Sequence, residues 1–317
     1  MSDMTKTGEA EGQDAMEQHA QTGGAGTNGQ AEMSGRAGMG GQTRASGHAG
    51  TLSATGLRTG YAERTIIENM DVTIPDGKIS VIIGSNGCGK STLLKTLARL
   101  LRPSAGQVLV DGRAISTIPT KKLAQKLGLL PQSSLVPDGI RVSDLVARGR
   151  FPYQGFMRGL QREDYEAVHE AMELMGITSL MDRPVDALSG GQRQRVWIAM
   201  ALAQQTDILL LDEPTTYLDI AYQVEILDLL SDLNRQRGTT IAMVLHDINL
   251  SARYADYMFA LRDGTLRHEG TPREVVTAQT MKEIFDLDCV VVDDPVSGTP
   301  LIVPRGRHHR EVEGTNK

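Results

Sequence analysis

The chain has 317 residues, 40% of them hydrophobic and 4% aromatic, and its 39 acidic and 33 basic residues give a net charge of −6. That balance excludes a surface that gathers nucleic acid or anionic lipid by charge alone, and two cysteines are too few for a disulfide framework. No apolar run reaches the roughly 18 residues of a membrane span and no signal-peptide pattern is present, so we expect a cytoplasmic protein that reaches a membrane only by docking onto another chain.

Residues 1–50 contain no Leu, Ile, Val, Phe, Tyr or Trp. Such a segment cannot bury enough apolar surface to offset the entropy lost on ordering. We therefore expect a disordered, low-complexity tail over 1–50, an ordered domain over 51–303, and a second, flexible tail over 304–317.

The first half of the ordered region alternates strand and helix patterns. Strands are expected at 52–61, 66–74 and 79–83, and a glycine-rich loop follows the third. Leucines recur at helical spacing from Leu93 to Leu101, which predicts a helix that ends before Pro103.

The second half begins with a mainly helical insertion over 138–187, with helices at 142–148 and 162–175. The remaining expected elements, in chain order, are a helix at 193–203, a strand at 208–211, a helix at 221–236, a strand at 240–245, a hairpin over 257–268 around Asp263-Gly264, a helix at 272–286, and strands at 289–293 and 300–303. The low aromatic content and the alternation of strands with helices predict an α/β fold with a mainly parallel sheet covered on both faces.

The glycine-rich loop, Gly84–Ser91, matches G-x-x-x-x-G-K-[ST]. Its backbone amides and the following helix N-terminus can converge on phosphate oxygens. Lys90 is expected to reach the β- and γ-phosphates, Ser91 to ligate Mg²⁺, and Thr92 to contact the α-phosphate. Cys88 has two interpretations: either the helix N-terminus stabilises its thiolate, so that alkylation blocks ATP binding, or it is a small residue that fits the loop.

Two acids follow the aliphatic strand at 208–211. Asp212 is suited to hold Mg²⁺ through water, and Glu213 to polarise the attacking water, unless the pair is only an acidic turn. His246 follows the strand Ile241–Leu245. From its position alone, His246 is either a structural residue or a contact of the γ-phosphate.

A second phosphate-binding turn is predicted at Leu188–Gln192, where a serine and two glycines precede a helix. The alternative is an ordinary capped helix. The two phosphate-binding loops lie about a hundred residues apart with the helical insertion between them. A head-to-tail pair of chains, each supplying one loop to each ATP, would reconcile them.

Taken together, these motifs resemble those of the ATPase subunit of an ABC transporter over residues 52–303. The residues that carry the resemblance are Gly84–Ser91, Gln132, Leu188–Gln192, Leu211–Pro214, Leu218-Asp219 and His246. The resemblance implies a P-loop NTPase core with a mainly parallel sheet, an antiparallel β subdomain and a helical subdomain insertion.

The resemblance also implies a role for each site residue. Tyr61 would stack on adenine, Gln132 would sense Mg²⁺ and water, and His246 would contact the γ-phosphate. Ser189 and Gly191 would contact the ATP of the partner subunit, and Asp219 would couple the two sites. The implied catalytic residues are Glu213, His246, Gln132 and Lys90; the nucleotide-binding residues are Tyr61, Gly84, Ser85, Asn86, Gly87, Cys88, Gly89, Lys90, Ser91, Thr92, Ser189, Gly190, Gly191, Gln192 and Asp219; the metal-binding residues are Ser91, Gln132 and Asp212.

Three segments, 145–154, 215–220 and 294–300, resemble those of ATPases that serve iron–siderophore importers. Tyr153, where many relatives have His, and the tail 1–50 depart from that pattern. The likeness implies ATP and Mg²⁺ as ligands, a homodimer, a multi-span permease, an extracellular or periplasmic siderophore-binding protein, no nucleic acid, and a place at the cytoplasmic face of the membrane. The alternatives are a cobalamin, haem or metal-ion importer ATPase, or a soluble ABC ATPase, which the single motif set and the absence of heptads disfavour.

Overall fold

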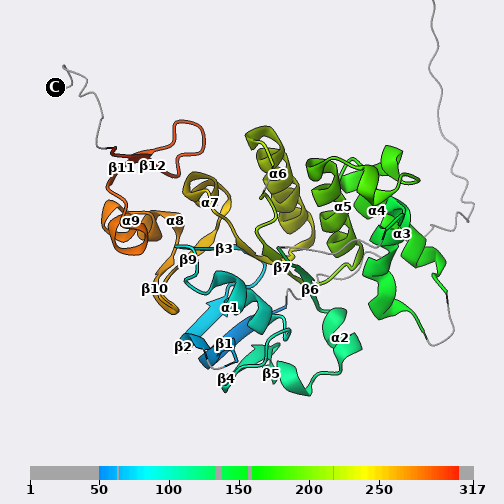
Figure 1. The fold of residues 1–317 in the computed structure, drawn as a ribbon, viewed down its shortest axis with the longest axis horizontal. Helices are drawn as coiled ribbons and strands as arrows, with labels where there is room; N and C mark the ends of the chain where they lie inside the picture. The colour runs from blue at the N-terminus through cyan, green and yellow to red at the C-terminus, as the bar shows by residue number, and fades with distance from the viewer. Residues whose placement is uncertain (1–49, 63, 133–137, 156–158, 217, 307–317) are drawn as a thin grey trace, which may run out of the picture. The chain divides into compact units, whose positions relative to one another are not determined.

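The computed structural model describes residues 50–62, 64–132, 138–155, 159–216 and 218–306 (Figure 1). Of the predicted tails over 1–50 and 304–317, residues 1–49 and 307–317 lie outside the described residues, and Pro304 is the last residue of a strand. None of the helices in the described part of the chain combines the length and the apolar character that crossing a membrane requires.

The larger sheet has six strands in the order β10-β9-β3-β8-β7-β6. Five of them run parallel, and only β10 pairs antiparallel, with β9. The strands are β3 (Ile79–Gly84), β6 (Leu127–Leu130), β7 (Ile208–Asp212), β8 (Thr240–Val244), β9 (Tyr257–Arg262) and β10 (Thr265–Gly270). Every residue of β3, β7 and β8 is buried, as expected for parallel strands covered on both faces. The predicted α/β fold with a mainly parallel sheet is confirmed.

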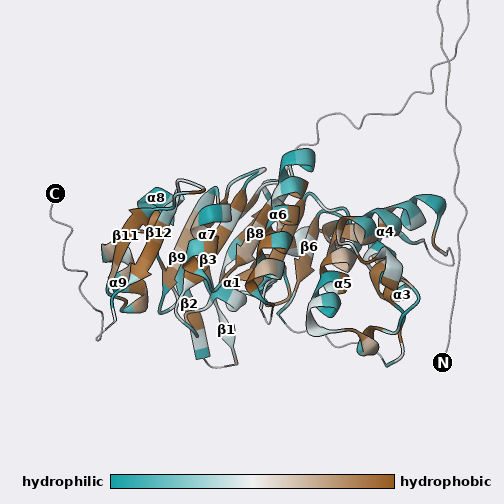
Figure 2. Cartoon of the chain, turned by 90° about the horizontal axis from the view of Figure 1, so that it is seen from above, coloured by the Kyte–Doolittle hydropathy of each residue, from teal (hydrophilic) through white to brown (hydrophobic). Residues whose placement is uncertain are grey.

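Alternate residues of the central strands enter two separate hydrophobic cores. Leu209 and Leu211 of β7 belong to one core, which the later helices cover, whereas Leu210 belongs to the other. Figure 2 shows hydrophobic colouring along the strands of this sheet and hydrophilic colouring along much of α4. The strand sequences are therefore aliphatic throughout because both of their faces are covered.

The second core lies between the larger sheet and an antiparallel sheet of order β2-β1-β4-β5. Its strands are β1 (Leu52–Tyr61), β2 (Arg64–Ile74), β4 (Ala105–Val110) and β5 (Arg113–Ala114). The two strands predicted here, 52–61 and 66–74, are confirmed as β1 and β2, which pair from Leu52 opposite Ile74. The strands β4, β5 and β6 were not predicted.

The helix after the phosphate loop, α1 (Lys90–Leu97), is shorter than the leucine spacing predicted. Arg99 adopts a left-handed conformation (φ 62°) and Leu100 is 67% exposed, so the last two leucines lie beyond the helix. Arg99 instead donates to the carbonyl oxygens of Ile115 (2.9 Å) and Ile118 (2.5 Å) around the short helix η1 (Ile115–Thr117). α2 (Thr120–Ala124) follows and precedes β6.

The predicted helices of the insertion are present as α3 and α4, and α5 packs against both. The helical segments are α3 (Val142–Ala147), η2 (Arg148–Tyr153), α4 (Arg162–Leu174), η3 (Thr178–Leu180), η4 (Val185–Ala187) and α5 (Gly190–Ala203). A buried ion pair, Arg150 Nε to Asp164 Oδ1 at 2.8 Å, joins η2 to α4, and Arg150 also donates to the carbonyl oxygen of Ala203 in α5. The helical packing therefore continues beyond residue 187.

The C-terminal part contains the predicted helix α6 (Ile220–Arg237), the hairpin β9–β10, and two strands that form a small separate sheet. The remaining elements are α7 (Ile248–Tyr254), which was not predicted, α8 (Pro272–Val275), α9 (Ala278–Phe285), β11 (Cys289–Asp293) and β12 (Pro300–Pro304). The prediction of one helix over 272–286 is wrong, because the chain turns at Val276 (ψ 80°) and Thr277 caps a new helix by accepting from the amide of Thr280.

Candidate functional site

The glycine-rich loop joins β3 to α1 and is held from both sides. Gly84 has a positive φ of 154°, and a Cβ there would lie 2.3 Å from the carbonyl oxygen of Leu261, so only glycine fits. Lys90 Nζ donates to the carbonyl oxygens of Gly84 (2.8 Å) and Ser85 (3.1 Å), which places its ammonium over the loop. Asn86 and Gly87 form the exposed tip. The loop thus holds a buried cation against two of its own carbonyl oxygens.

The turn of the β9–β10 hairpin packs against this loop and is hydrogen-bonded to it. Gly264 donates its amide to the carbonyl oxygen of Cys88 at 3.1 Å. Gly264 has φ 72°, and a Cβ there would lie 1.8 Å from the carbonyl oxygen of Ile66 in β2. The phosphate loop, the hairpin turn and the antiparallel sheet therefore meet at one glycine.

The surroundings of the Cys88 side chain disfavour a thiolate. It is 3% exposed and belongs to the second hydrophobic core. Burial raises the pKa of Cys88, and the nearby Lys90 only partly opposes this. Of the two interpretations of Cys88, its burial and raised pKa favour the small residue that fits the loop over a thiolate stabilised by the helix N-terminus.

Ser91 and Asp212 meet across the loop and the end of β7. Ser91 Oγ donates to Asp212 Oδ1 at 2.9 Å, and Asp212 is 2% exposed. Asp212 Oδ2 is buried and has no hydrogen-bond partner among the described atoms. Burial first, and then the neighbouring Glu213 charge, raise the pKa of Asp212. An unpartnered carboxylate oxygen beside a hydroxyl is suited to a hard cation, which binds oxygen ligands.

The three residues predicted to bind metal are not all together. Ser91 bonds to Asp212, whereas Gln132 bonds to the next carboxylate along the chain: its Nε2 donates to Glu213 Oε2 at 2.8 Å. Within the described ranges no group of three or more His, Cys, Asp or Glu side chains is placed to hold a metal. An ion at Asp212 would therefore need further oxygen ligands from Ser91, water or the nucleotide.

Glu213 lies at the centre of a hydrogen-bonded group at the carboxyl edge of the sheet. The backbone of Glu213 is left-handed (φ 56°), directly after β7. Its Oε1 lies 2.7 Å from His246 Nε2, and its Oε2 accepts from Thr216 Oγ1 at 3.0 Å as well as from Gln132. The structure thus brings Gln132, Glu213 and His246 together; Thr216 was missed in the sequence, although its spacing of three residues from Glu213 is a signal.

These contacts determine the charge of Glu213. Burial alone would raise the pKa of this carboxyl, but the hydrogen bonds from His246, Thr216 and Gln132 outweigh it and lower the pKa below its usual value. The Glu213 side chain is only 8% exposed, whereas that of His246 is 49% exposed. Glu213 is therefore a carboxylate that stays charged although it is buried, and the imidazole beside it is half exposed to solvent.

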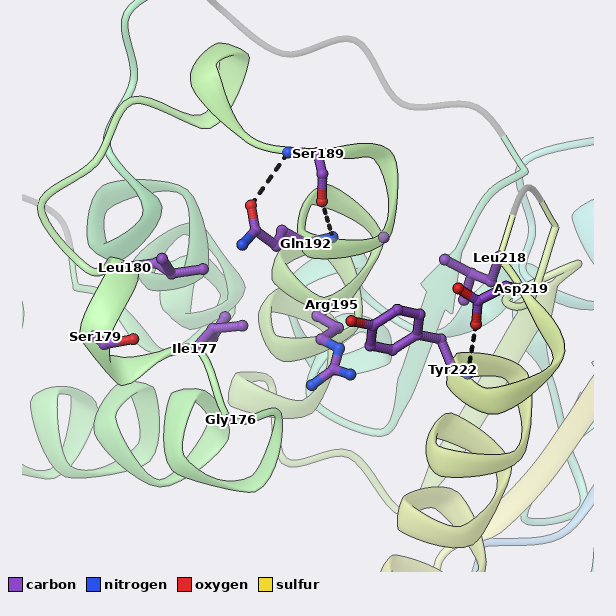
Figure 3. A pocket seen from close by; sticks show the side chains of 11 residues that line it. Gly176, Ile177, Ser179, Leu180, Ser189, Gln192, Arg195, Leu218, Asp219 and Tyr222 are labelled. Carbon is purple, nitrogen blue, oxygen red and sulfur yellow. Dashed lines mark hydrogen bonds between the residues drawn. The ribbon is translucent and has the colours of Figure 1, made fainter.

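The predicted second phosphate-binding turn is the N-terminus of α5. Ser189 caps this helix: Ser189 Oγ accepts from the amide of Gln192 at 3.3 Å, and Gln192 Oε1 accepts from the amide of Ser189 at 3.2 Å (Figure 3). A Cβ on Gly190 would meet open space, whereas one on Gly191 would lie 3.3 Å from Leu218. The turn is therefore both an ordinary capping box and an open helix N-terminus.

An open pocket of about 410 Å³ adjoins this turn (Figure 3). It is lined by Gly176, Ile177, Ser179, Leu180, Ser189, Gly191, Gln192, Arg195, Leu218, Asp219 and Tyr222. Asp219 Oδ1 caps α6 by accepting from the amide of Tyr222 at 3.1 Å. The Arg195 guanidinium lies 4.9 Å from the Tyr222 ring centroid and pairs with Glu225, so Arg195 and Tyr222 join the site although the sequence did not indicate them.

The two predicted phosphate-binding turns are not joined within one chain. No hydrogen bond or ion pair links the described atoms of residues 84–92 to those of 189–192. The helix α1 belongs to one hydrophobic core and α5 to the other. Tyr61, at the end of β1, is 47% exposed and so presents a free ring surface.

Comparisons with known proteins agree on one family. A family model described as ABC transporter matches residues 67–216. The chain is 54% identical over 251 residues to the ferric enterobactin transport ATP-binding protein of Escherichia coli, which covers 79% of this chain and 93% of that protein. It is 51% identical over 264 residues to the achromobactin transport ATP-binding protein of Dickeya dadantii (83% and 98% covered) and 50% identical over 251 residues to the iron(3+)-hydroxamate import ATP-binding protein of Bacillus subtilis (79% and 93% covered).

Solved structures agree with these relatives. A protein described as a metal-chelate type ABC transporter, solved in an inward-facing conformation, matches with a TM-score of 0.70 at 29% identity, over 81% of this chain and 98% of that chain. A bacterial ABC transporter cassette solved as a dimer matches with a TM-score of 0.62 at 29% identity, over 69% of this chain and 98% of that chain.

Proposed function

This chain belongs to the ABC transporter family of ATPases, and we propose that it energises the uptake of ferric siderophores through a separate membrane permease. The observation that carries the proposal is the meeting of three groups at the carboxyl edge of one parallel sheet: the Lys90 loop, the Ser91–Asp212 pair, and the Gln132–Glu213–His246 cluster. The substrate is supported by the relatives that transport ferric enterobactin, achromobactin and iron(3+)-hydroxamates. The proposed ATPase domain spans residues 51–303, with the helical subdomain at about 138–187.

The phosphates of ATP would lie against Gly84–Thr92. Lys90 Nζ donates to the carbonyl oxygens of Gly84 and Ser85, which holds its ammonium beside the loop where the phosphates would lie. The exposed ring of Tyr61 would stack on the adenine. A cation inside a backbone cradle holds a polyphosphate through charge-assisted hydrogen bonds.

Ser91 Oγ and Asp212 Oδ2 fit the magnesium ion that accompanies ATP. When bound, Mg²⁺ neutralises negative charge on the phosphate oxygens. The fit rests on the buried, unpartnered Oδ2 next to the Ser91 hydroxyl. Burial of Asp212 disfavours its charged form, and a bound cation would stabilise that form. Ser91 and Asp212 therefore fit a site that becomes fully charged only with the ion.

Glu213 would orient the attacking water and accept its proton. The lowered pKa of Glu213 keeps its carboxylate charged, and three donors hold it in one orientation. Of those three, Gln132 and His246 follow the strands on either side of β7; Gln132 would sense Mg²⁺ and the attacking water, and His246 would contact the γ-phosphate. Phosphoryl transfer depends mainly on such positioning and charge stabilisation.

A second copy of the chain would complete the site. The Ser189 turn has no bond to residues 84–92 of its own chain, and the similar bacterial cassette was solved as a dimer. Ser189, Gly190, Gly191 and Gln192 would therefore close on the γ-phosphate held by the partner, and Asp219, in the same pocket, would couple the two sites. The further proposed partners are a multi-span permease and an extracellular or periplasmic siderophore-binding protein, with this subunit at the cytoplasmic face.

The substrate proposal is tested by uptake in a strain that lacks the chain. Complementation with the wild type should restore the uptake of labelled ferric siderophore, whereas Glu213→Gln should not. Restored uptake of cobalamin, haem or a free metal ion in place of the ferric chelate would support the alternative importer class. If complementation with the wild type restores none of these uptakes but the purified chain still hydrolyses ATP, the transport role is wrong and the ATPase assignment stands.

A further inference from the structure

The segment Asp294–Pro300 is one of the sequence features that the proposed mechanism leaves unexplained. In the structure it is the turn between β11 and β12, organised around the 5% exposed Asp294. Asp294 Oδ1 accepts from the amide of Val296 (2.9 Å), Oδ2 accepts from Ser297 Oγ (2.7 Å), and the Asp294 amide donates to the carbonyl oxygen of Thr299 (2.8 Å). The turn is therefore a closed, preorganised loop with one carboxylate at its centre.

The same carboxylate binds a helix of the ATPase core. Asp294 Oδ2 accepts from Arg253 Nε (3.1 Å) and Arg253 Nη2 (2.6 Å), and Arg253 belongs to α7. Four residues earlier, on the same face of α7, Asn249 makes two hydrogen bonds to the backbone of Ile302 in β12: its Oδ1 accepts from the amide (2.8 Å) and its Nδ2 donates to the carbonyl oxygen (3.3 Å). The hairpin β11–β12 is thus attached to α7 at two successive turns.

The helix α7 begins directly after His246. Asp247 is its N-cap, since its Oδ1 accepts from the amide of Leu250 at 2.8 Å. The far end of α7 has an anchor of its own, because Tyr254 donates to Asp228 of α6 at 2.8 Å. In the first turn, next to the half-exposed His246, Ile248 and Leu250 pack into the core that the later helices cover, and Asn249 adds the directional hydrogen bonds to β12.

We propose that the C-terminal hairpin, residues 289–304, positions His246 against Glu213 by fixing α7 through Asn249 and Arg253. The proposal rests on the proposed role of Glu213 and His246 in ATP hydrolysis. Asn249, Arg253 and Asp294 are positioning residues: within the part of the chain that the structure describes, their side-chain hydrogen bonds join α7 to the hairpin or lie within the hairpin, and none goes to the Glu213 cluster. A displacement of about 1 Å at a reacting group can cost two orders of magnitude in rate, so a remote attachment of this kind is sufficient to control turnover.

The test compares two variants that break the attachment between α7 and the hairpin, one on each side, with a matched control in the purified full chain. Asn249→Ala and Asp294→Asn should lower kcat for ATP roughly tenfold, with the KM for ATP and the number of bound ATP-analogue molecules per chain unchanged. The control is Asp293→Asn, which removes the adjacent carboxylate that pairs with Arg273 at the surface (3.0 Å) and should leave all three quantities unchanged. A fall in binding stoichiometry in proportion to the lost activity would overturn the proposal, because it would indicate unfolding.

A double-mutant cycle with His246→Ala separates positioning from general damage. In that background Asn249→Ala should cause no further loss, since the group that it positions is gone. The imidazole resonances of His246, identified by their disappearance in His246→Ala, should shift in Asn249→Ala but not in Asp293→Asn. An additive loss of activity, or unshifted resonances, would overturn the positioning role alone. Full activity of His246→Ala would overturn both this inference and the proposed role of His246.

Discussion

Replacing Glu213 by glutamine tests the centre of the proposed site. The substitution keeps the size of the side chain and still offers an oxygen to Gln132 or Thr216, but it removes the charge that faces His246 at 2.7 Å and the capacity to take a proton. General base catalysis contributes about 10²–10⁴-fold to a rate. We therefore expect kcat to fall about 10³-fold, which corresponds to about 4 kcal/mol of transition-state stabilisation.

ATP binding should survive the same change. The proposed phosphate contacts lie in the Lys90 loop and the proposed Mg²⁺ ligands are Ser91 and Asp212; the hydrogen bonds of Lys90 and Ser91 go to other groups than the Glu213 side chain. The ATP dissociation constant should therefore change by less than about threefold, and ATP should accumulate in a stable pair of chains because it is no longer consumed.

The assay combines steady-state phosphate release, calorimetric titration with ATP, and light scattering in the presence of ATP. Glu166→Gln, at an exposed acid that pairs with Arg162 on α4, is the matched control and should leave all three measurements unchanged. A Glu213→Gln chain that turns over normally, or one that stays monomeric when saturated with ATP, would refute the reasoning.

Three further predictions follow from the described contacts. Lys90→Ala removes the cation of the phosphate loop and should abolish most ATP affinity; a calorimetric affinity equal to that of the wild type would contradict its assignment. Arg150→Ala leaves Asp164 charged and buried without its partner, so the free energy of unfolding should fall by about 3 kcal/mol in denaturant titrations, whereas the exposed Arg162→Ala should have little effect. Hydrogen bonds lower the pKa of Asp164 despite its burial. The stability that this carboxylate contributes is therefore complete above about pH 4, near the pKa of the unfolded chain, and is lost as the pH falls through the lower pKa of the folded chain. Asp164→Asn should flatten the dependence of the unfolding free energy on pH in that acid range, and an unchanged slope would count against the ion pair.

The features that the sequence predicted best are those in which neighbouring residues act together. The loop Gly84–Ser91 follows a strand and opens a helix, as expected, because its glycines and Lys90 are consecutive in the sequence and a local pattern is enough to locate it. The aliphatic strand before Asp212 was similarly clear, because a strand covered on both faces has no polar positions to interrupt it.

Contacts across the sheet were harder to predict. The hydrogen bonds of Glu213 to Gln132 and His246 depend on β6 and β8 lying on either side of β7, an order that local periodicity does not determine. The strand β6 was missed because it has only four residues, one of them a glycine. Helix ends also failed, since Leu100 continues the leucine spacing although the helix has already ended at Leu97.

The glycine under the phosphate loop has a consequence for how this chain tolerates sequence change. At position 264 every side chain would collide with the carbonyl oxygen of Ile66, and relief of that collision would move the turn whose amide supports Cys88. In a library that varies the hairpin turn and selects for growth on an iron chelate, position 264 should therefore accept glycine alone, while the neighbouring Asp263, whose side chain is 79% exposed but whose backbone is left-handed (φ 49°), should accept asparagine and glycine as well. The evolvability of the nucleotide site is in this way limited by a residue that never touches the nucleotide.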